Sequence, residues 1–359
     1  MRTLVAGSIA ILCRIPLGAA EAPPPALDIR SPVKGAKIES GVVEFFAQLR
    51  NAPAEKLLLR LAVAGKSSAG PRHCILVDPD DPWTAPARVL NVFEDLLLLT
   101  AGAHELAVEL AGVETGKVLL SDKIPFSVAG PPPAAIDRYR AEAALSLANG
   151  ARWLRQAEDD YARELVRQKA DGAAYGGDAK GAAARYLMYV NLDFFQRMQG
   201  YAILASHYDR SWQQADALAC LNLAEEILQK EKERTVVAAP FGAWPIVRSP
   251  EGVSKAPSHY EGYARFYARR GDLAPAVEWL LKEAAWYEQQ ATAAPPSQGQ
   301  TTEARKLEAE SYRKIAHLHV MLASDLDGYA KHIARFKAML PESARNANYS
   351  SFGPVMRAF

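Results

Sequence analysis

The stretch Ala129-Gly130-Pro131-Pro132-Pro133 separates two kinds of sequence pattern. Before it, apolar and polar residues alternate, the spacing that sends successive side chains to opposite faces of a strand. After it, apolar residues recur with the period of an α-helix. Because proline fixes φ and favours an extended connector, we place a boundary here. The sequence predicts a β-domain over residues 26–129, a linker over 130–135 and an α-helical domain over 136–341.

Short alternating runs define the predicted β-domain. They cover residues 43–49, 57–63, 106–110 and 124–128. Turn-forming residues lie between them, for example Lys34-Gly35 and Thr115-Gly116. Several short strands separated in this way are typical of an antiparallel β-sandwich.

The helical part reads as consecutive pairs of helices. The predicted pairs are 183–206 with 211–232, 258–269 with 274–289, and 302–323 with 326–340. A single helical hairpin cannot bury its apolar faces alone, so hairpins of this kind stack on one another. The expected fold class is therefore multidomain β plus α, a β-sandwich followed by an all-α array of helical hairpins, with residues 342–359 as a C-terminal tail.

Parts of the predicted β-domain resemble a known kind of module. These parts are Ser31-Pro32-Val33-Lys34-Gly35, Gly102-Ala103-His104-Glu105-Leu106 and Ile124-Pro125-Phe126-Ser127-Val128. They resemble immunoglobulin-like modules of the bacterial and fibronectin types. The Cys, Trp, Cys spacing of antibody domains is not present in this region.

The middle helix pair carries a second resemblance. It presents small and aromatic residues at a repeat-like spacing, namely Tyr260, Tyr263, Ala264, Tyr267, Gly271, Leu273, Ala276 and Leu280. This pattern resembles a tetratricopeptide repeat, in which the first helix of each pair lines a concave surface that receives peptides. The resemblance implies that Glu261, Arg265 and Arg269 face that surface. Two guanidinium groups one turn apart could then bind a peptide carboxylate through paired hydrogen bonds; the alternative is that both arginines serve only solubility.

The segment from Thr235 to Pro257 is long for a helix connection and unusually apolar. It contains Phe241 and Trp244, which we add to the candidate binding residues because they could cover a groove. The alternative is that these two aromatic residues plug the helical core.

The first residues follow the pattern of a secretory signal. Arg2 precedes an apolar stretch from Leu4 to Leu12, and small residues follow at Gly18, Ala19 and Ala20. We expect residues 1–22 to act as a signal peptide with cleavage after Ala20. The expected location is therefore secreted, periplasmic or the lumen of the secretory pathway.

Charge and motif content argue against several functions. Forty-two basic residues nearly balance 41 acidic ones and no long basic run occurs, so nucleic acid is not an expected partner. We expect no membrane span in the mature chain, no cofactor, no metal site and no catalytic residues. The acidic stretch Asp78-Pro79-Asp80-Asp81-Pro82 could offer oxygens to calcium, but a solvated turn is the preferred interpretation.

Two functional hypotheses follow. The first is a non-enzymatic interaction protein whose helical array binds a protein or peptide partner. The second is a carbohydrate-active or other envelope enzyme, with a sugar partner stacked on aromatic residues and two carboxylates facing a cleft.

Overall fold

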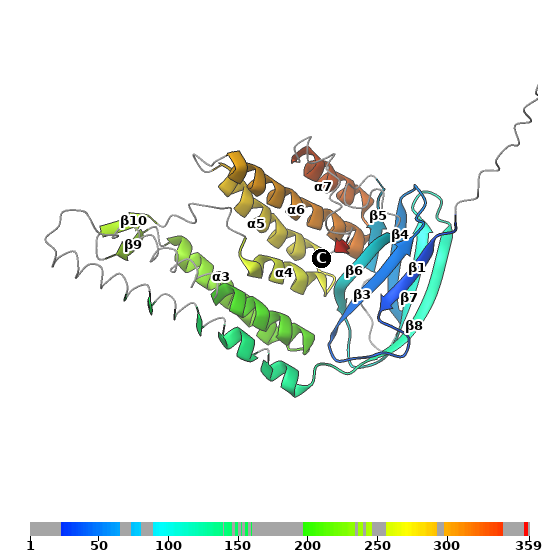
Figure 1. Ribbon diagram of the computed structural model, residues 1–359, viewed down its shortest axis with the longest axis horizontal. Helices are drawn as coiled ribbons and strands as arrows, with labels where there is room; N and C mark the ends of the chain where they lie inside the picture. The colour runs from blue at the N-terminus through cyan, green and yellow to red at the C-terminus, as the bar shows by residue number, and fades with distance from the viewer. Residues whose placement is uncertain are drawn as a thin grey trace, which may run out of the picture.

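The computed structural model describes residues 23–64, 73–79, 89–138, 140–145, 148–149, 152, 155–156, 159, 197–233, 236–239, 242–245, 256–292, 298–339 and 355–357. A β-sandwich stands beside an array of helices in this part of the chain (Figure 1). The predicted fold class is therefore confirmed. Among the helices within these ranges, none combines the length and apolar composition that crossing a bilayer requires.

Two sheets form the sandwich. In one sheet the strand order is β1 (Ala26–Ser31), β3 (Val42–Arg50), β6 (Val89–Leu98) and β11 (Val355–Arg357). In the other the order is β2 (Lys37–Ile38), β8 (Val118–Val128), β7 (Gly102–Gly112), β4 (Leu57–Ala64) and β5 (His73–Val77). Most neighbouring strands are antiparallel, whereas β2 on β8 and β11 on β6 are parallel.

The sandwich core comes from the alternating positions that the sequence indicates. Phe45, Leu59, Val108 and Phe126 are buried in one cluster between the sheets. Successive side chains of a strand point to opposite faces, so residues i and i+2 lie on the same face of the sheet. All four predicted strands are confirmed, and β6 is a strand that the sequence reading did not identify.

The helices follow one another as pairs. Helical residues 197–210 precede α3 (Gln214–Glu233); the later pairs are α4 (Ser258–Ala268) with α5 (Leu273–Thr292), and α6 (Gln298–Ala323) with α7 (Leu326–Met339). Ala264 and Ala276 are fully buried, so α4 and α5 can approach closely. Between the first and second pairs, β9 (Val236–Ala239) and β10 (Gly242–Pro245) form an antiparallel hairpin.

The turns within the three pairs share one backbone feature. Trp212, Gly271 and Ser324 follow the first helix of each pair, with φ of 61°, 80° and 52°. A left-handed residue ends a helix and reverses the chain. Figure 1 shows the ends of α4 and α6 that lead into their turns on the side of the array nearest the sandwich.

Strand β5 and the start of β4 are buried on both faces because they join the two units. Leu57 and Leu59 point into the sandwich core, whereas Leu58, Cys74 and Leu76 lie in the cluster formed by α4 to α7. Odd and even positions of the same apolar run therefore belong to different cores.

Polar contacts reinforce this interface. The Cys74 thiol lies 3.5 Å from the hydroxyl of Ser324, and the Tyr329 hydroxyl donates to Asp78 at 3.3 Å. Asp78 also pairs with Lys56 at 3.3 Å and is buried, so the interpretation of this residue as part of a solvated turn is wrong. The remainder of that acidic stretch from Asp80 onward lies outside the described residues.

A second contact joins the first turn of the array to the sandwich. The indole Nε1 of Trp212 donates to the carbonyl of Leu99 at 2.7 Å, and the Gly41 amide donates to the carbonyl of Arg210 at 2.7 Å. A Cβ at Gly41 would lie 2.6 Å from the indole nitrogen, and one at Gly130 would lie 2.5 Å from the indole ring. Glycine at both positions lets the tryptophan seat against the sandwich.

Candidate functional site

Three of the predicted binding residues, Glu261, Arg265 and Arg269, lie on α4 or at its end. Lys314 of α6 reaches Glu261 of α4 at 3.5 Å, and Arg269 at the end of α4 reaches Asp209 at 2.7 Å. These two ion pairs connect α4 to helix 197–210 and to α6. We call Glu261, Arg265 and Lys314 the charged face, because these three side chains remain partly exposed there.

Glu261 lies between the two cations of the charged face. Its carboxylate accepts from Arg265 Nε at 3.2 Å and from Arg265 Nη2 at 2.7 Å, one helical turn along α4. Burial alone would raise the pKa of Glu261, but the charges of Lys314 and Arg265 hold this pKa below its ordinary value. Glu261 is therefore an anion at neutral pH.

Lys314 is held by two carboxylates. Its ammonium donates to Glu283 of α5 at 3.0 and 3.2 Å, in addition to its contact with Glu261. Burial alone would lower the pKa of Lys314, but Glu283 and Glu261 raise it above its usual value. The Ser311 hydroxyl also donates to Glu283 at 3.1 Å. Two residues of α6 therefore supply hydrogen-bond donors to this buried carboxylate.

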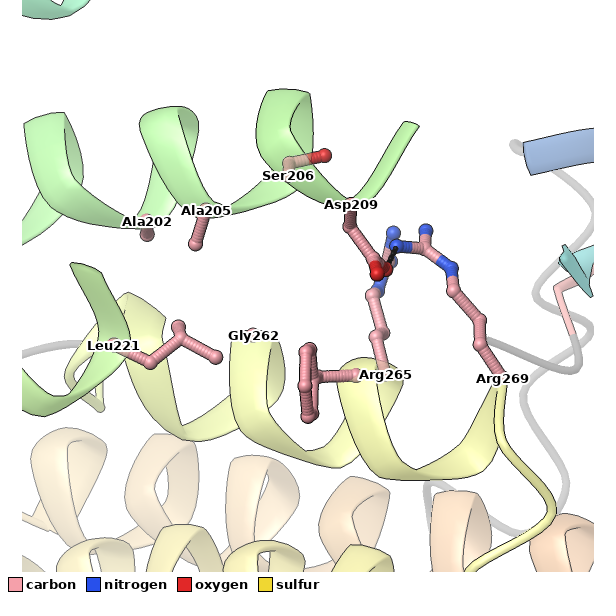
Figure 2. A pocket seen from close by; sticks show the side chains of 9 residues that line it. Ala202, Ala205, Ser206, Asp209, Leu221, Gly262, Arg265 and Arg269 are labelled. Carbon is pink, nitrogen blue, oxygen red and sulfur yellow. Dashed lines mark hydrogen bonds and ion pairs between the residues drawn. The ribbon is translucent and has the colours of Figure 1, made fainter. Parts of the chain in front are cut away.

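The structure corrects the expectation for Arg269. The sequence places Arg265 and Arg269 together as exposed groove residues, yet only Arg265 is partly exposed. Arg269 is buried and pairs with Asp209 at 2.7 Å (Figure 2). Arg270 pairs with the other carboxylate oxygen of Asp209 at 2.6 Å and completes a clamp. The physical reason is that Asp209, near the end of helix 197–210, would be a buried unpaired charge without these guanidinium groups.

A small cavity adjoins this clamp. It measures about 30 Å³ and is lined by Ala202, Ala205, Ser206, Asp209, Leu221, Gly262, Arg265, Phe266 and Arg269. Figure 2 shows these side chains between helix 197–210 and α4. Such a space admits one or a few water molecules. It is too small for a peptide segment or a sugar ring.

The structure gives no contact between the predicted aromatic residues and the charged face within the part of the chain that it describes. Phe241 lies outside the described residues. Trp244 belongs to β10, where its backbone pairs with Val237 of β9. Its predicted role as a groove cover stays a prediction.

Other aromatic rings of α4 and α5 serve packing. Trp279 stacks on Tyr263 with centroids 3.9 Å apart, and the Lys282 ammonium lies 3.6 Å above the Trp279 ring. The Tyr263 hydroxyl donates to Asn222 of α3 at 2.5 Å. These contacts fill the space between the helices.

A metal site needs several ligands close together. Within those ranges no group of at least three His, Cys, Asp or Glu side chains is placed to hold a metal ion. His317 is buried against Tyr329, whereas His319 accepts or donates a hydrogen bond with Asp325 at 2.9 Å and stacks on His332.

Sequence reasoning missed Asp209, Glu283 and Lys314. A signal existed for Glu283, because this acidic residue lies in the apolar stripe of α5 next to Ala284 and three residues after Leu280. A buried carboxylate demands a cationic partner, but the sequence does not identify Lys314, 31 residues away, as that partner. The same holds for Asp209 and Arg269, which are 60 residues apart.

Comparison with known proteins adds little. No protein-family model matches the chain, and no curated protein does. Among solved structures, native alpha-2-macroglobulin from Escherichia coli, spanning domain MG7 to the C-terminus, aligns with 89% of this chain and 55% of its own at 11% identity. The chain thus spans about half of that structure. With a TM-score of 0.19, we draw nothing from this similarity.

Proposed function

We propose that this chain is a non-enzymatic interaction protein, secreted or located in the cell envelope or secretory lumen. Its helical array, which resembles tetratricopeptide repeats, binds a protein or peptide segment on the charged face. The observation that carries the proposal is the arrangement of Arg265 and Lys314. These two cations come from different helices, remain 31% and 25% exposed, and flank the single carboxylate of Glu261.

The charged face suits recognition because it is ordered before a partner arrives. The ammonium of Lys314 is hydrogen-bonded to the buried Glu283, and the guanidinium of Arg265 is hydrogen-bonded to Glu261. Side chains that are already immobilised lose less conformational entropy on binding. A guanidinium and an ammonium can donate hydrogen bonds to a carboxylate or a backbone carbonyl of an incoming peptide.

The sandwich has a supporting role in this proposal. It resembles immunoglobulin-like modules and packs on the turns of the array through Trp212 and through β5. A module fixed in this way sets the orientation of the charged face relative to the rest of the chain and offers a second contact surface.

The alternative function, a carbohydrate-active enzyme, receives less support. Such an enzyme needs two carboxylates that face a cleft. Glu261 and Glu283 do converge, but on the ammonium of Lys314, and Glu283 is buried. Trp279 is covered on its two faces by Tyr263 and Lys282, which leaves no ring face for a sugar.

Site-specific photo-cross-linking tests the proposed face in the producing cells. A photoreactive amino acid at position 265 should trap a discrete partner, whereas the same group at Leu223, an exposed position on α3, should not. The trapped partner is then purified and its affinity for the unmodified chain is measured. Equal trapping from positions 265 and 223, or a purified partner that does not bind, would contradict the proposal.

Export is tested separately. N-terminal sequencing of protein from the native source should find a mature start near Glu21. Recovery of an intact Met1 from the cytosolic fraction would remove the proposed location without affecting the binding face.

A further inference from the structure

The free edges of the sandwich are protected in different ways. On β1, Asp28 and Arg30 place a charged pair on the strand, and the pairing with β3 becomes irregular between Ile29 and Ser31. Strand β2 has only two residues. Charges, irregular pairing and short length each discourage another strand from adding to a sheet edge.

The edge strand β5 is protected by burial. All five of its residues are buried, and Cys74 and Leu76 lie in the core shared with α6 and α7. A sheet edge covered by a helix offers no room for another strand.

Strand β6 is a long strand that lies next to the short last strand of its sheet, β11. It has ten residues, with the sequence Val-Leu-Asn-Val-Phe-Glu-Asp-Leu-Leu-Leu, and pairs on its inner side with β3 from Val89 to Leu98. On its outer side only three residues are covered among those described, by β11 at the C-terminus of the chain. The register is parallel, with Met356 opposite Val92.

We propose that the outer edge of β6 is a strand-docking site for an extended peptide, and that the C-terminal segment of this chain is its resident, displaceable occupant. The chemistry recognised is an extended backbone that pairs in parallel with β6 around Val92. This surface belongs to the sandwich and goes beyond the charged face of the array.

The backbone explains why such an occupant binds and why it can be displaced. Strand addition satisfies edge N–H and C=O groups, which supplies affinity, while the alternate side chains of the added strand supply specificity. Three residue pairs give a small contact. A tethered segment nevertheless stays bound because its effective concentration is high, and a free peptide must compete with that concentration.

Hydrogen exchange on the full-length protein tests the docking. Met356→Pro removes one backbone N–H and restricts φ, so it should break the pairing, whereas Met356→Ala keeps the backbone intact. In Met356→Pro the outward-pointing amides among Asn91, Val92 and Phe93 should exchange roughly ten-fold faster or more. They should stay protected in Met356→Ala. The Leu99 amide, bonded to Gly41, serves as the internal control.

Rebinding in trans completes the test. A synthetic peptide with the sequence of residues 350–359 is added to the Met356→Pro protein and should restore the lost protection. Three further peptides each carry one N-methyl group, at position 355, 356 or 357. Alternate residues of a strand point their N–H groups to the same side. Methylation at 355 and 357 should therefore have one effect on the restored protection, and methylation at 356 the opposite effect.

Three results would overturn the proposal. The first is unchanged exchange at residues 91–93 in Met356→Pro with the Leu99 control intact. The second is equal loss of protection in Met356→Ala. The third is restoration by a scrambled peptide, which would indicate non-specific apolar adsorption. None of these measurements involves Arg265 or an external partner, so failure here leaves the proposed function untouched.

Discussion

The guanidinium of Arg269 lies 2.7 Å from the carboxylate of Asp209, with side chains only 4% and 3% exposed. This buried pair ties the second helical pair of the array to the first. It also separates two arginines that look equivalent in the sequence, because Arg265 lies on the partly exposed charged face. Buried and exposed ion pairs have different consequences when one partner is removed.

Arg269→Ala should therefore destabilise the protein strongly. It leaves the buried Asp209 charge paired with Arg270, and removing one partner of a buried pair costs about 3–5 kcal/mol. Arg265→Ala is the matched control, with an expected loss of about 0–1 kcal/mol. Urea unfolding measures both free energies. Equal losses for the two variants would mean that the Arg269 pair is not buried as described.

Trp212→Ala should loosen the sandwich from the array. The variant loses the bond to Leu99 and the ring that covers Gly41 and Gly130. Because the indole is partly exposed, we expect less than the roughly 3–5 kcal/mol of a fully buried tryptophan. Calorimetry should show one transition in the parent and two in the variant. A single unshifted transition would show that this contact does not couple the units.

Tyr263 separates packing from hydrogen bonding. Tyr263→Ala removes the ring that stacks on Trp279 and should cost about 3–5 kcal/mol. Tyr263→Phe keeps the ring and loses the bond to Asn222, so it should cost about 0.5–1.5 kcal/mol. Thermal unfolding compares the two. Similar losses would show that the hydroxyl, rather than the ring, fixes α4 against its neighbours.

His73 should make stability depend on pH. Burial lowers the pKa of this histidine from 6.5 to about 4, so the folded protein keeps it neutral while the unfolded chain takes up a proton below pH 6.5. Its contribution is complete above pH 6.5 and is lost as pH falls towards 4. In His73→Val the fall in the free energy of unfolding over this pH range should be smaller by up to about 3 kcal/mol. Urea unfolding at pH 7.5, 5.5 and 4.5 gives the slopes, and identical slopes would refute this assignment.

The sequence predicts the order of the units and most elements, because residue period depends on local geometry. The alternation of Leu57 and Leu59 identifies β4, and the spacing of Ala264 and Ala276 indicates a tight helix pair. The packing of Leu58 against helices could not be read in the same way. It depends on which unit covers the outer face of the sheet, and local pattern does not contain that information.

The candidate site was predicted only in part for the same reason. Glu261 and Arg265 are one turn apart on α4, so their proximity follows from helix geometry. Arg269 lies a further turn along, where the helix ends and Asp209 arrives from another hairpin. Lys314 joins the face because α6 packs on α5 and its side chain reaches Glu261 of α4, a relationship between segments about 50 residues apart in the sequence.

The most direct measurement of the central claim is the affinity of the purified cross-linked partner for an Arg265→Glu variant. Charge reversal should weaken binding about ten-fold or more, equivalent to 1.4 kcal/mol or more, while the melting temperature changes little because Arg265 is partly exposed. Leu223→Glu, an exposed change on α3, should bind like the parent. If Arg265→Glu binds as tightly as the parent and Leu223→Glu, the charged face is not the binding surface.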